Sequence, residues 1–179
     1  TFTRFASLLP AGGRLVVPAL EARARGAASA SAAPIWLTQI TTRDDVPLSD
    51  GIAALGLEPH PEGTRFTLRL PGQGQPFGPS AGCLTPEASL AIDLPLPGRH
   101  NVMNALVAAG LAFAAGADPR TFATAFASFK LPFKRLTLRG EAAKIPIIDD
   151  FAHHPTAIAA TIAAVRQRYP DKRMVALFE

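Results

Sequence analysis

Ile147-Ile148-Asp149-Asp150-Phe151-Ala152-His153-His154-Pro155-Thr156 is the stretch that decides the fold. Apolar residues of an expected strand end in two carboxylates, two imidazoles follow, and Pro155 suits the first turn of a helix that should run to residue 169. In open α/β sheets, ligands bind beyond the carboxyl ends of the strands. The stretch therefore predicts an α/β fold with a ligand site where this strand passes into this helix.

The four polar side chains of this stretch allow more than one kind of site. Asp149, Asp150, His153 and His154 could ligate a metal, as in a metal-dependent hydrolase, because carboxylates and imidazoles are common metal ligands. Alternatively, Asp150 at the strand end accepts hydrogen bonds from the ribose hydroxyls of a nucleotide. A third interpretation is structural: Asp150 caps the following loop and one histidine packs beside the site. The spacing alone leaves all three open.

The sequence around this stretch predicts the start of a parallel α/β unit. Leu131-Pro132 indicates a hinge or a domain boundary. After it, the pattern predicts strands 135–139 and 144–149, the helix 155–169 and a core strand 173–178.

The first half of the chain predicts shorter elements. Arg65–Leu70 alternates apolar and polar residues, so Phe66, Leu68 and Leu70 should share one buried face, and a turn is expected at 71–74. With a second extended segment it should form a small antiparallel sheet. The other expected elements are a helix end at 1–9, strands 14–19, 35–40 and 88–96, and a helix in 21–33.

Asn101–Ala115 contains no charged residue, so we expect a helix buried on most of its surface and ended by Gly116. Asp118-Pro119 should open a further helix with Phe122, Phe126 and Phe129 as its apolar stripe.

Asn101 and Asn104 lie three residues apart and share one face of the first of these helices. Either they satisfy backbone groups, or their amides bind the edge of a planar heterocycle. Lys134-Arg135, after the expected boundary, is either a pair of solvated cations or a cation placed near a base or a phosphate.

The composition limits the class of protein. Hydrophobic residues make up 48% and charged residues 18% of the 179 residues, which predicts a globular chain with a substantial core. The formal net charge is +4, but no run of Lys and Arg indicates nucleic-acid binding, and no apolar run reaches the length of a membrane span. The single Cys83 fits a reducing compartment. Because Thr1 is not a methionine and an apolar strand is expected at the last residues, we expect a fragment of a longer protein.

Three motifs in order resemble the Mur ligase family: Gly98-Arg99-His100-Asn101-Val102-Met103-Asn104, then Phe129 to Arg135, then Asp149 to Thr156. Members of this family use ATP and Mg²⁺ to join an amino acid or peptide to a UDP-muramyl precursor of bacterial peptidoglycan. The resemblance is strong from Gly98 to Glu179 and thin from Arg23 to Pro97. It implies a cytoplasmic bacterial enzyme, expected to be a monomer, with no nucleic-acid or membrane partner.

The wording of the last motif is most similar to members that attach the tripeptide L-alanyl-γ-D-glutamyl-meso-diaminopimelate to UDP-N-acetylmuramate in peptidoglycan recycling. Members that attach L-alanine usually have Tyr and Gly in place of Phe151 and Ala152, and tend to have Glu in place of Ala157. L-Alanine ligation is therefore the second candidate activity. Glu179 also favours the tripeptide group.

The resemblance also implies roles and domains. Asn101 and Asn104 would lie against adenine, Arg135 near the nucleotide and Asp150 on the ribose, while His153 and His154 would face the acceptor. Residues 1–131 would be part of a central ATP-binding domain and 132–179 the start of a Rossmann-like C-terminal domain. The family's phosphate loop and Mg²⁺ ligands are expected before Thr1, so residues 1–179 alone should have no ligase activity.

Overall fold

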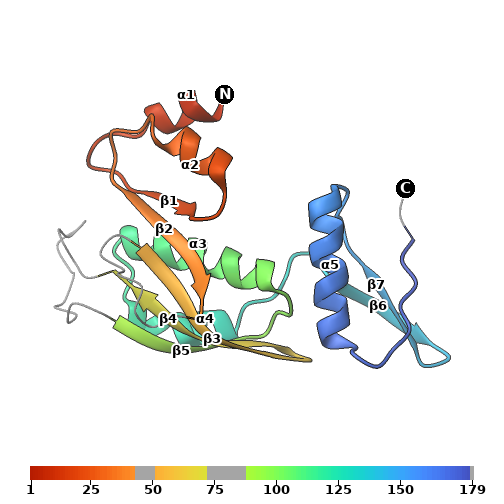
Figure 1. Cartoon of the computed structure of the whole chain (residues 1–179). Helices are drawn as coiled ribbons and strands as arrows, with labels where there is room; N and C mark the ends of the chain where they lie inside the picture. Colours follow the sequence, from red (N-terminus) through yellow and green to blue (C-terminus); the bar gives the residue numbers. More distant parts are fainter. Residues whose placement is uncertain (43–50, 72–87, 178–179) are drawn as a thin grey trace.

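The computed structural model describes residues 1–42, 51–71 and 88–177, and within them the largest element is a mixed five-stranded sheet (Figure 1). Its strand order is β1-β2-β3-β4-β5. The first three strands run parallel, and the last two are antiparallel to their neighbours. The strands are β1 (Leu15–Pro18), β2 (Ile35–Thr41), β3 (Gly51–His60), β4 (Gly63–Leu70) and β5 (Ala88–Leu94).

β3 lies in the middle of the sheet and was not predicted from the sequence. Its residues include Gly, Ala and Pro59, which are depleted in strands, so neither composition nor alternation indicates one. The run from Ile52 to Leu55 is nevertheless buried on both faces, as expected for a strand flanked on both sides. β4 and β5 were predicted as a separate antiparallel sheet, and β3 joins them to β1 and β2.

The core lies between this sheet and α3 (Arg99–Ala114), which contacts β1, β2, β3 and β4. Val102 and Leu106 of the helix are fully buried, as are Ile52 and Leu68 of the sheet. The alternation predicted in β4 is confirmed, because Leu68 and the other two residues of that face are at most 4% exposed. The helix itself ends as predicted, with Gly116 at φ 88°.

Most residues of α3 are buried or partly buried, as expected, but the exposed positions gather on one side. Asn104 and Ala108 are exposed, and Leu111 is 52% exposed. The sheet covers one side of the helix only, so packing against the sheet does not explain why the other side lacks charged residues. That side lines the cavity described below.

The remaining elements before residue 131 are short helices. α1 (Phe2–Ser7) packs on α2 (Ala22–Ala28), which contacts β1. Asp118 accepts a hydrogen bond from the Arg120 amide at 3.0 Å and opens the 3-10 turn η1 (Pro119–Thr121), which continues into α4 (Phe122–Ala127) against β5. This confirms the predicted capping.

The C-terminal part contains an antiparallel pair, β6 (Thr137–Ala142) and β7 (Ile145–Asp149), followed by α5 (Pro155–Arg168). Pro155 occupies the first turn of α5, as predicted. The strand predicted at 173–178 is not present over the described residues 173–177, where Val175 is 72% and Leu177 94% exposed. A strand needs a neighbour for its backbone hydrogen bonds, and β7 pairs only with β6 among the described residues.

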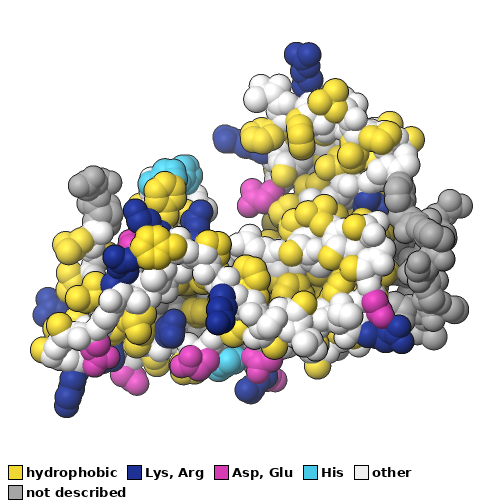
Figure 2. Space-filling model, turned by 180° about the vertical axis from the view of Figure 1, so that it is seen from behind, with side chains coloured by type: hydrophobic (Ala, Val, Ile, Leu, Met, Phe, Trp, Pro, Cys, Tyr) yellow, Lys and Arg dark blue, Asp and Glu magenta, His cyan; other side chains and the backbone are white. Residues whose placement is uncertain are grey.

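Figure 2 shows hydrophobic side chains exposed over both the N-terminal helices and the C-terminal part of the molecule. No helix in the described ranges is long and apolar enough to cross a membrane. The turn expected at residues 72–74, Cys83 and Glu179 lie outside the described residues.

Candidate functional site

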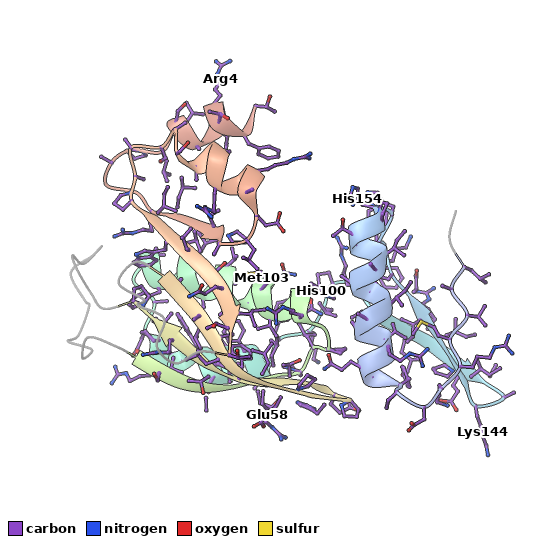
Figure 3. All side chains as sticks on the ribbon, viewed as in Figure 1. Arg4, Glu58, His100, Met103, Lys144 and His154 are labelled. Carbon is purple, nitrogen blue, oxygen red and sulfur yellow. The ribbon has the colours of Figure 1, made fainter. Side chains whose placement is uncertain are left out.

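A cavity of about 750 Å³ lies between α3, the connector (residues 131–136) and α5. Side chains of α3 form one wall and those of the first half of α5 form the opposite wall. Figure 3 shows His100 at the end of α3 nearest α5, and His154 at the beginning of α5. The predicted site residues that line the cavity are Asn101, Asn104, Arg135, Asp150 and His154. Residues of three motifs that are far apart in the sequence therefore meet in one cavity.

The two asparagines of α3 have different surroundings. Asn101 is 6% exposed, and its side-chain amide donates a hydrogen bond of 2.8 Å to the Pro97 carbonyl, so it fastens the beginning of the helix. Asn104 is exposed to the cavity and makes no hydrogen bond to another described residue. Its donors and acceptor are available to a ligand, which makes Asn104 the better candidate for binding a heterocycle.

Asp150 ties three segments together. Its Oδ2 accepts a hydrogen bond from the Leu136 amide at 2.9 Å. Its Oδ1 accepts one from the Ala152 amide at 2.9 Å and one from the Thr161 hydroxyl at 3.1 Å. A carboxylate can accept about four hydrogen bonds, so one position on Oδ2 is left for a ligand. The structural interpretation of Asp150 as a loop cap is thus confirmed, and it leaves room for a binding role.

The connector has an unusual backbone on both sides of Arg135. Lys134 has φ 60° and Leu136 has φ 47°, a region that non-glycine residues adopt at a cost of about 1 kcal/mol or more each. The Phe151 amide donates to the Lys134 carbonyl at 2.9 Å, and Asp150 holds Leu136 as described. These bonds fix the connector to the end of β7. Arg135 lies in the cavity wall, with its guanidinium carbon 5.9 Å from the centre of the Phe151 ring.

Asp149, His153 and His154 do not form a metal-binding group with Asp150, although His154 lines the same cavity. Asp149 is not among the residues that line the cavity. The His153 Nδ1 is 2.9 Å from the Phe151 carbonyl, and the His154 Nδ1 accepts a hydrogen bond from the Thr156 amide at the start of α5. In the part of the chain that is described, no three His, Cys, Asp or Glu side chains are placed to hold a metal ion together. The interpretation of these four residues as one metal site is therefore wrong.

His100 and Thr161 line the same cavity and were not predicted as site residues. Burial lowers the pKa of the His100 imidazole, and the negative charge of Asp150 opposes this effect. His100 belongs to the first motif, so its position beside Asn101 was a usable signal. Thr161 had no signal in the sequence, because it contributes through a contact made only in the folded chain.

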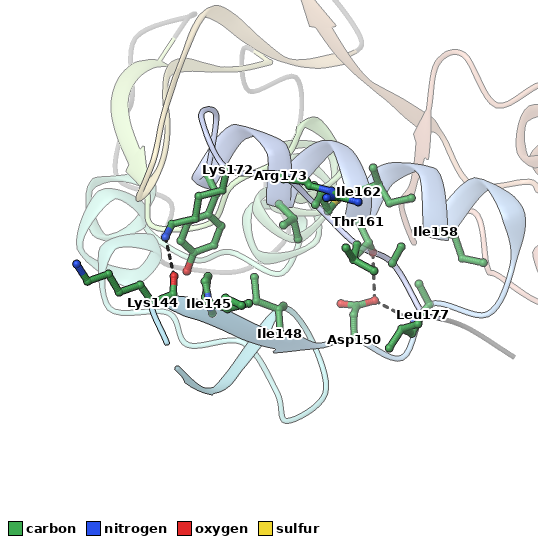
Figure 4. Close-up of a pocket in the computed structure, with 17 residues that line it drawn as sticks. Lys144, Ile145, Ile148, Asp150, Ile158, Thr161, Ile162, Lys172, Arg173 and Leu177 are labelled. Atoms are coloured by element: carbon green, nitrogen blue, oxygen red, sulfur yellow. Dashed lines mark hydrogen bonds between the residues drawn. The ribbon is translucent and has the colours of Figure 1, made fainter. Parts of the chain in front are cut away.

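A second cavity, of about 720 Å³, lies on the other side of α5 (Figure 4). β7, α5 and residues 172–177 line it, mostly with aliphatic side chains such as Ile148 and Ile162. Asp150 and Thr161 line both cavities, and Figure 4 shows the hydrogen bond between them.

The fold and cavity define a mixed α/β protein whose candidate site lies where the C-terminal part meets the larger sheet. Residues 134–179 match the family described as Mur ligase, glutamate ligase domain. The UDP-N-acetylmuramate–L-alanine ligase of Acidithiobacillus ferrooxidans is 46% identical over 90 residues, which is 50% of this chain and 19% of that protein. The enzyme of the same name from Xanthomonas campestris pv. campestris is 40% identical over 64% of this chain and 22% of its own length.

The chain therefore spans about a fifth of the length of these curated relatives. Among solved structures, a murein peptide ligase from Psychrobacter arcticus aligns over 96% of this chain and 32% of its own, with a TM-score of 0.63 and 27% identity. Over the matched residues the chain is therefore similar to Mur ligases, as its three motifs indicated. Members of this family are ATP-dependent ligases that act in peptidoglycan synthesis.

Proposed function

We propose that the longer protein containing this chain is an ATP-dependent ligase and that the cavity between α3 and α5 binds its nucleotide. Residues 1–131 would then be part of the central ATP-binding domain and 132–179 the start of the C-terminal domain. The observation that supports this best is that the unpaired amide of Asn104 and the Asp150 carboxylate line one cavity of about 750 Å³. Ligand cavities of proteins usually measure about 300–1,000 Å³.

The groups in the cavity suit a nucleotide. The amide of Asn104 can both donate to and accept from the edge of adenine, Asp150 can accept from a ribose hydroxyl, and the Arg135 cation can lie near a phosphate. ATP supplies the phosphoryl group that activates a carboxylate for attack by an amine. The described residues offer no cluster for Mg²⁺, so its main ligands would belong to other parts of the longer protein, as would the residues that bind the phosphates.

For the substrates, we propose UDP-N-acetylmuramate and the tripeptide L-alanyl-γ-D-glutamyl-meso-diaminopimelate, in a cytoplasmic, monomeric recycling enzyme. The motif wording around Phe151 and Ala152 supports the tripeptide, and a murein peptide ligase is similar over nearly the whole chain. L-Alanine is the second candidate, favoured by the L-alanine ligases that are 40–46% identical to this chain. Product formation by the full-length protein with each acceptor at equal concentration would decide between them.

Asn104→Asp in the full-length protein tests the nucleotide site. The change preserves shape but replaces two donors with a negative charge, so ATP affinity should fall about tenfold or more. The thermal midpoint should change little, because Asn104 is exposed and bonds no described residue. Gln39→Glu, the equivalent change on β2 at a residue that does not line the cavity, is the control and should leave ATP affinity unaltered. Equal ATP affinity of the Asn104→Asp variant and the unmodified protein would refute the adenine role.

A further inference from the structure

The side chain of Gln167 connects the end of α5 to two segments of the larger sheet region. Its Nε2 lies within hydrogen-bond distance of the His60 carbonyl (3.1 Å), the Gly63 carbonyl (2.6 Å) and the Thr64 hydroxyl (3.3 Å). Its Oε1 accepts a hydrogen bond of 2.9 Å from the Gly98 amide. A single side chain thus uses both ends of its amide to join α5 to the β3–β4 hairpin and to the start of α3.

The hairpin reaches α5 because β3 continues to His60, beyond Leu55, where its pairing with β2 ends. Figure 1 shows the tip of this hairpin beside the C-terminal end of α5. The neighbouring Arg168 and Glu62 approach to 3.9 Å, but Glu62 is 79% exposed, so this ion pair contributes little. The amide of Gln167, which is only partly exposed, is the stronger connection.

Gly98 permits the close approach on the other side of this contact. Its φ is 97°, and a Cβ built on it would lie 2.8 Å from the Cβ of Ala164, which is fully buried. Ala164 lies one turn before Gln167 on α5, so the helix contact and the hydrogen bond occur on the same face.

This face of α5 is also a wall of the candidate nucleotide cavity. Ala157, Ala160, Ala164 and Gln167 follow one another at intervals of three or four residues and therefore share one side of the helix. Ala157 and Ala160 line the cavity, as does Asn104 of α3. Ala164 and Gln167, further along the same side of α5, contact Gly98 at the start of α3.

We propose that Gln167 is a positioning residue: it pins α5 to the start of α3 and so sets the width of the nucleotide cavity. Gln167 itself does not line the cavity and acts through α5. The part of this inference that concerns nucleotide binding rests on the proposed function, whereas the pin itself does not. Without the pin, α5 can move away from α3 about the connector, and Asp150 then loses its position relative to Asn104.

Gln167→Met in the full-length protein tests the pin, because methionine has a similar length and flexibility but makes none of these hydrogen bonds. Hydrogen–deuterium exchange of peptides that cover Gly98 should become about tenfold faster, since the Gly98 amide loses its acceptor. Exchange in the interior of α3 should not change. ATP should bind several-fold more weakly while the thermal midpoint of the sheet is retained. Gln39→Met on β2 is the matched control.

If Gln167→Met does not fold, Gln167→Glu provides the second measurement. A carboxylate still accepts from Gly98 but repels the carbonyls of His60 and Gly63, so peptides of the hairpin tip should exchange faster. Unchanged exchange at both Gly98 and the hairpin would overturn the pin. Faster exchange with unaltered ATP affinity would overturn the positioning role. If the unmodified protein does not bind ATP, the proposed function fails, and the exchange measurements still decide on the pin.

Discussion

The Thr161 hydroxyl of α5 donates a 3.1 Å hydrogen bond to Oδ1 of Asp150, at the point where β7 passes into the loop before α5. Because Asp150 also accepts from the Leu136 amide, this bond links the helix, the end of the strand and the connector through one carboxylate. The orientation of Asp150 in the cavity therefore depends on a residue that lies eleven positions further along the chain.

Thr161→Val should lower the free energy of unfolding by about 1 kcal/mol, because a partly buried hydrogen bond is lost while side-chain volume is preserved. ATP affinity should fall several-fold in the same variant, since Asp150 is less well oriented. Thr161→Ser retains the hydroxyl and should remain close to the unmodified protein in both properties. Urea unfolding and ATP titration measure the two effects, and equal behaviour of the Val and Ser variants would contradict the role of the hydroxyl.

His100 should titrate below 6.5, because burial lowers the pKa of its imidazole. Asp150 raises that pKa, so Asp150→Asn should lower it further. The folded state binds this proton less readily than the unfolded state, and the contribution of His100 to stability is therefore lost progressively as pH falls from 6.5. An NMR titration of the His100 ring in both proteins measures its pKa. A higher pKa in Asp150→Asn than in the unmodified protein would contradict this prediction.

The β6–β7 hairpin should be stabilised by a better turn sequence. Ala143 and Lys144 both have positive φ, 49° and 64°, and they join the paired residues Ala142 and Ile145. Asn-Gly suits such a two-residue turn better than Ala-Lys does. Ala143→Asn with Lys144→Gly should raise the free energy of unfolding by about 1 kcal/mol, measured in urea. The Lys172 bond survives, because it is made to the backbone carbonyl of residue 144.

Leu106→Ala should cost about 2–5 kcal/mol of stability, because Leu106 is fully buried between α3 and the sheet and its removal leaves a cavity. Leu111→Ala on the same helix is the matched control. Leu111 is 52% exposed, so its replacement should cost less than about 1 kcal/mol. Similar thermal midpoints for the two variants would show that the packing of α3 on the sheet is not as described.

Much of the fold was predictable where the sequence carries a local signal. The alternation in β4, the cap at Asp118 and the proline at the start of α5 each predict an element that is present. β3 was missed, and the strand predicted at 173–178 is absent over the described residues 173–177, for opposite reasons. β3 has a composition that disfavours a strand, but it is buried within the sheet. The apolar segment at 173–177 has no neighbouring strand to pair with among the described residues.

The candidate site was predictable as a set of motifs but not as an arrangement. The motifs indicated Asn104 and Asp150, and the fold brings both to one cavity. Asn101 donates a hydrogen bond to the Pro97 carbonyl, whereas Asn104 is unpaired. This difference depends on which side of α3 the sheet covers. The contacts of Thr161 and Gln167 depend on how α5 packs, which no spacing in the sequence specifies. The nucleotide roles of these residues stay predictions.

The small side chains along the inner face of α5 have a thermodynamic consequence. Ala164 meets Gly98 there, and Gln167 adds polar bonds, so separating α5 from α3 would uncover little nonpolar surface. The heat capacity change of such a separation is correspondingly small. A calorimetric scan would therefore record the melting of the sheet and scarcely register the opening of this contact.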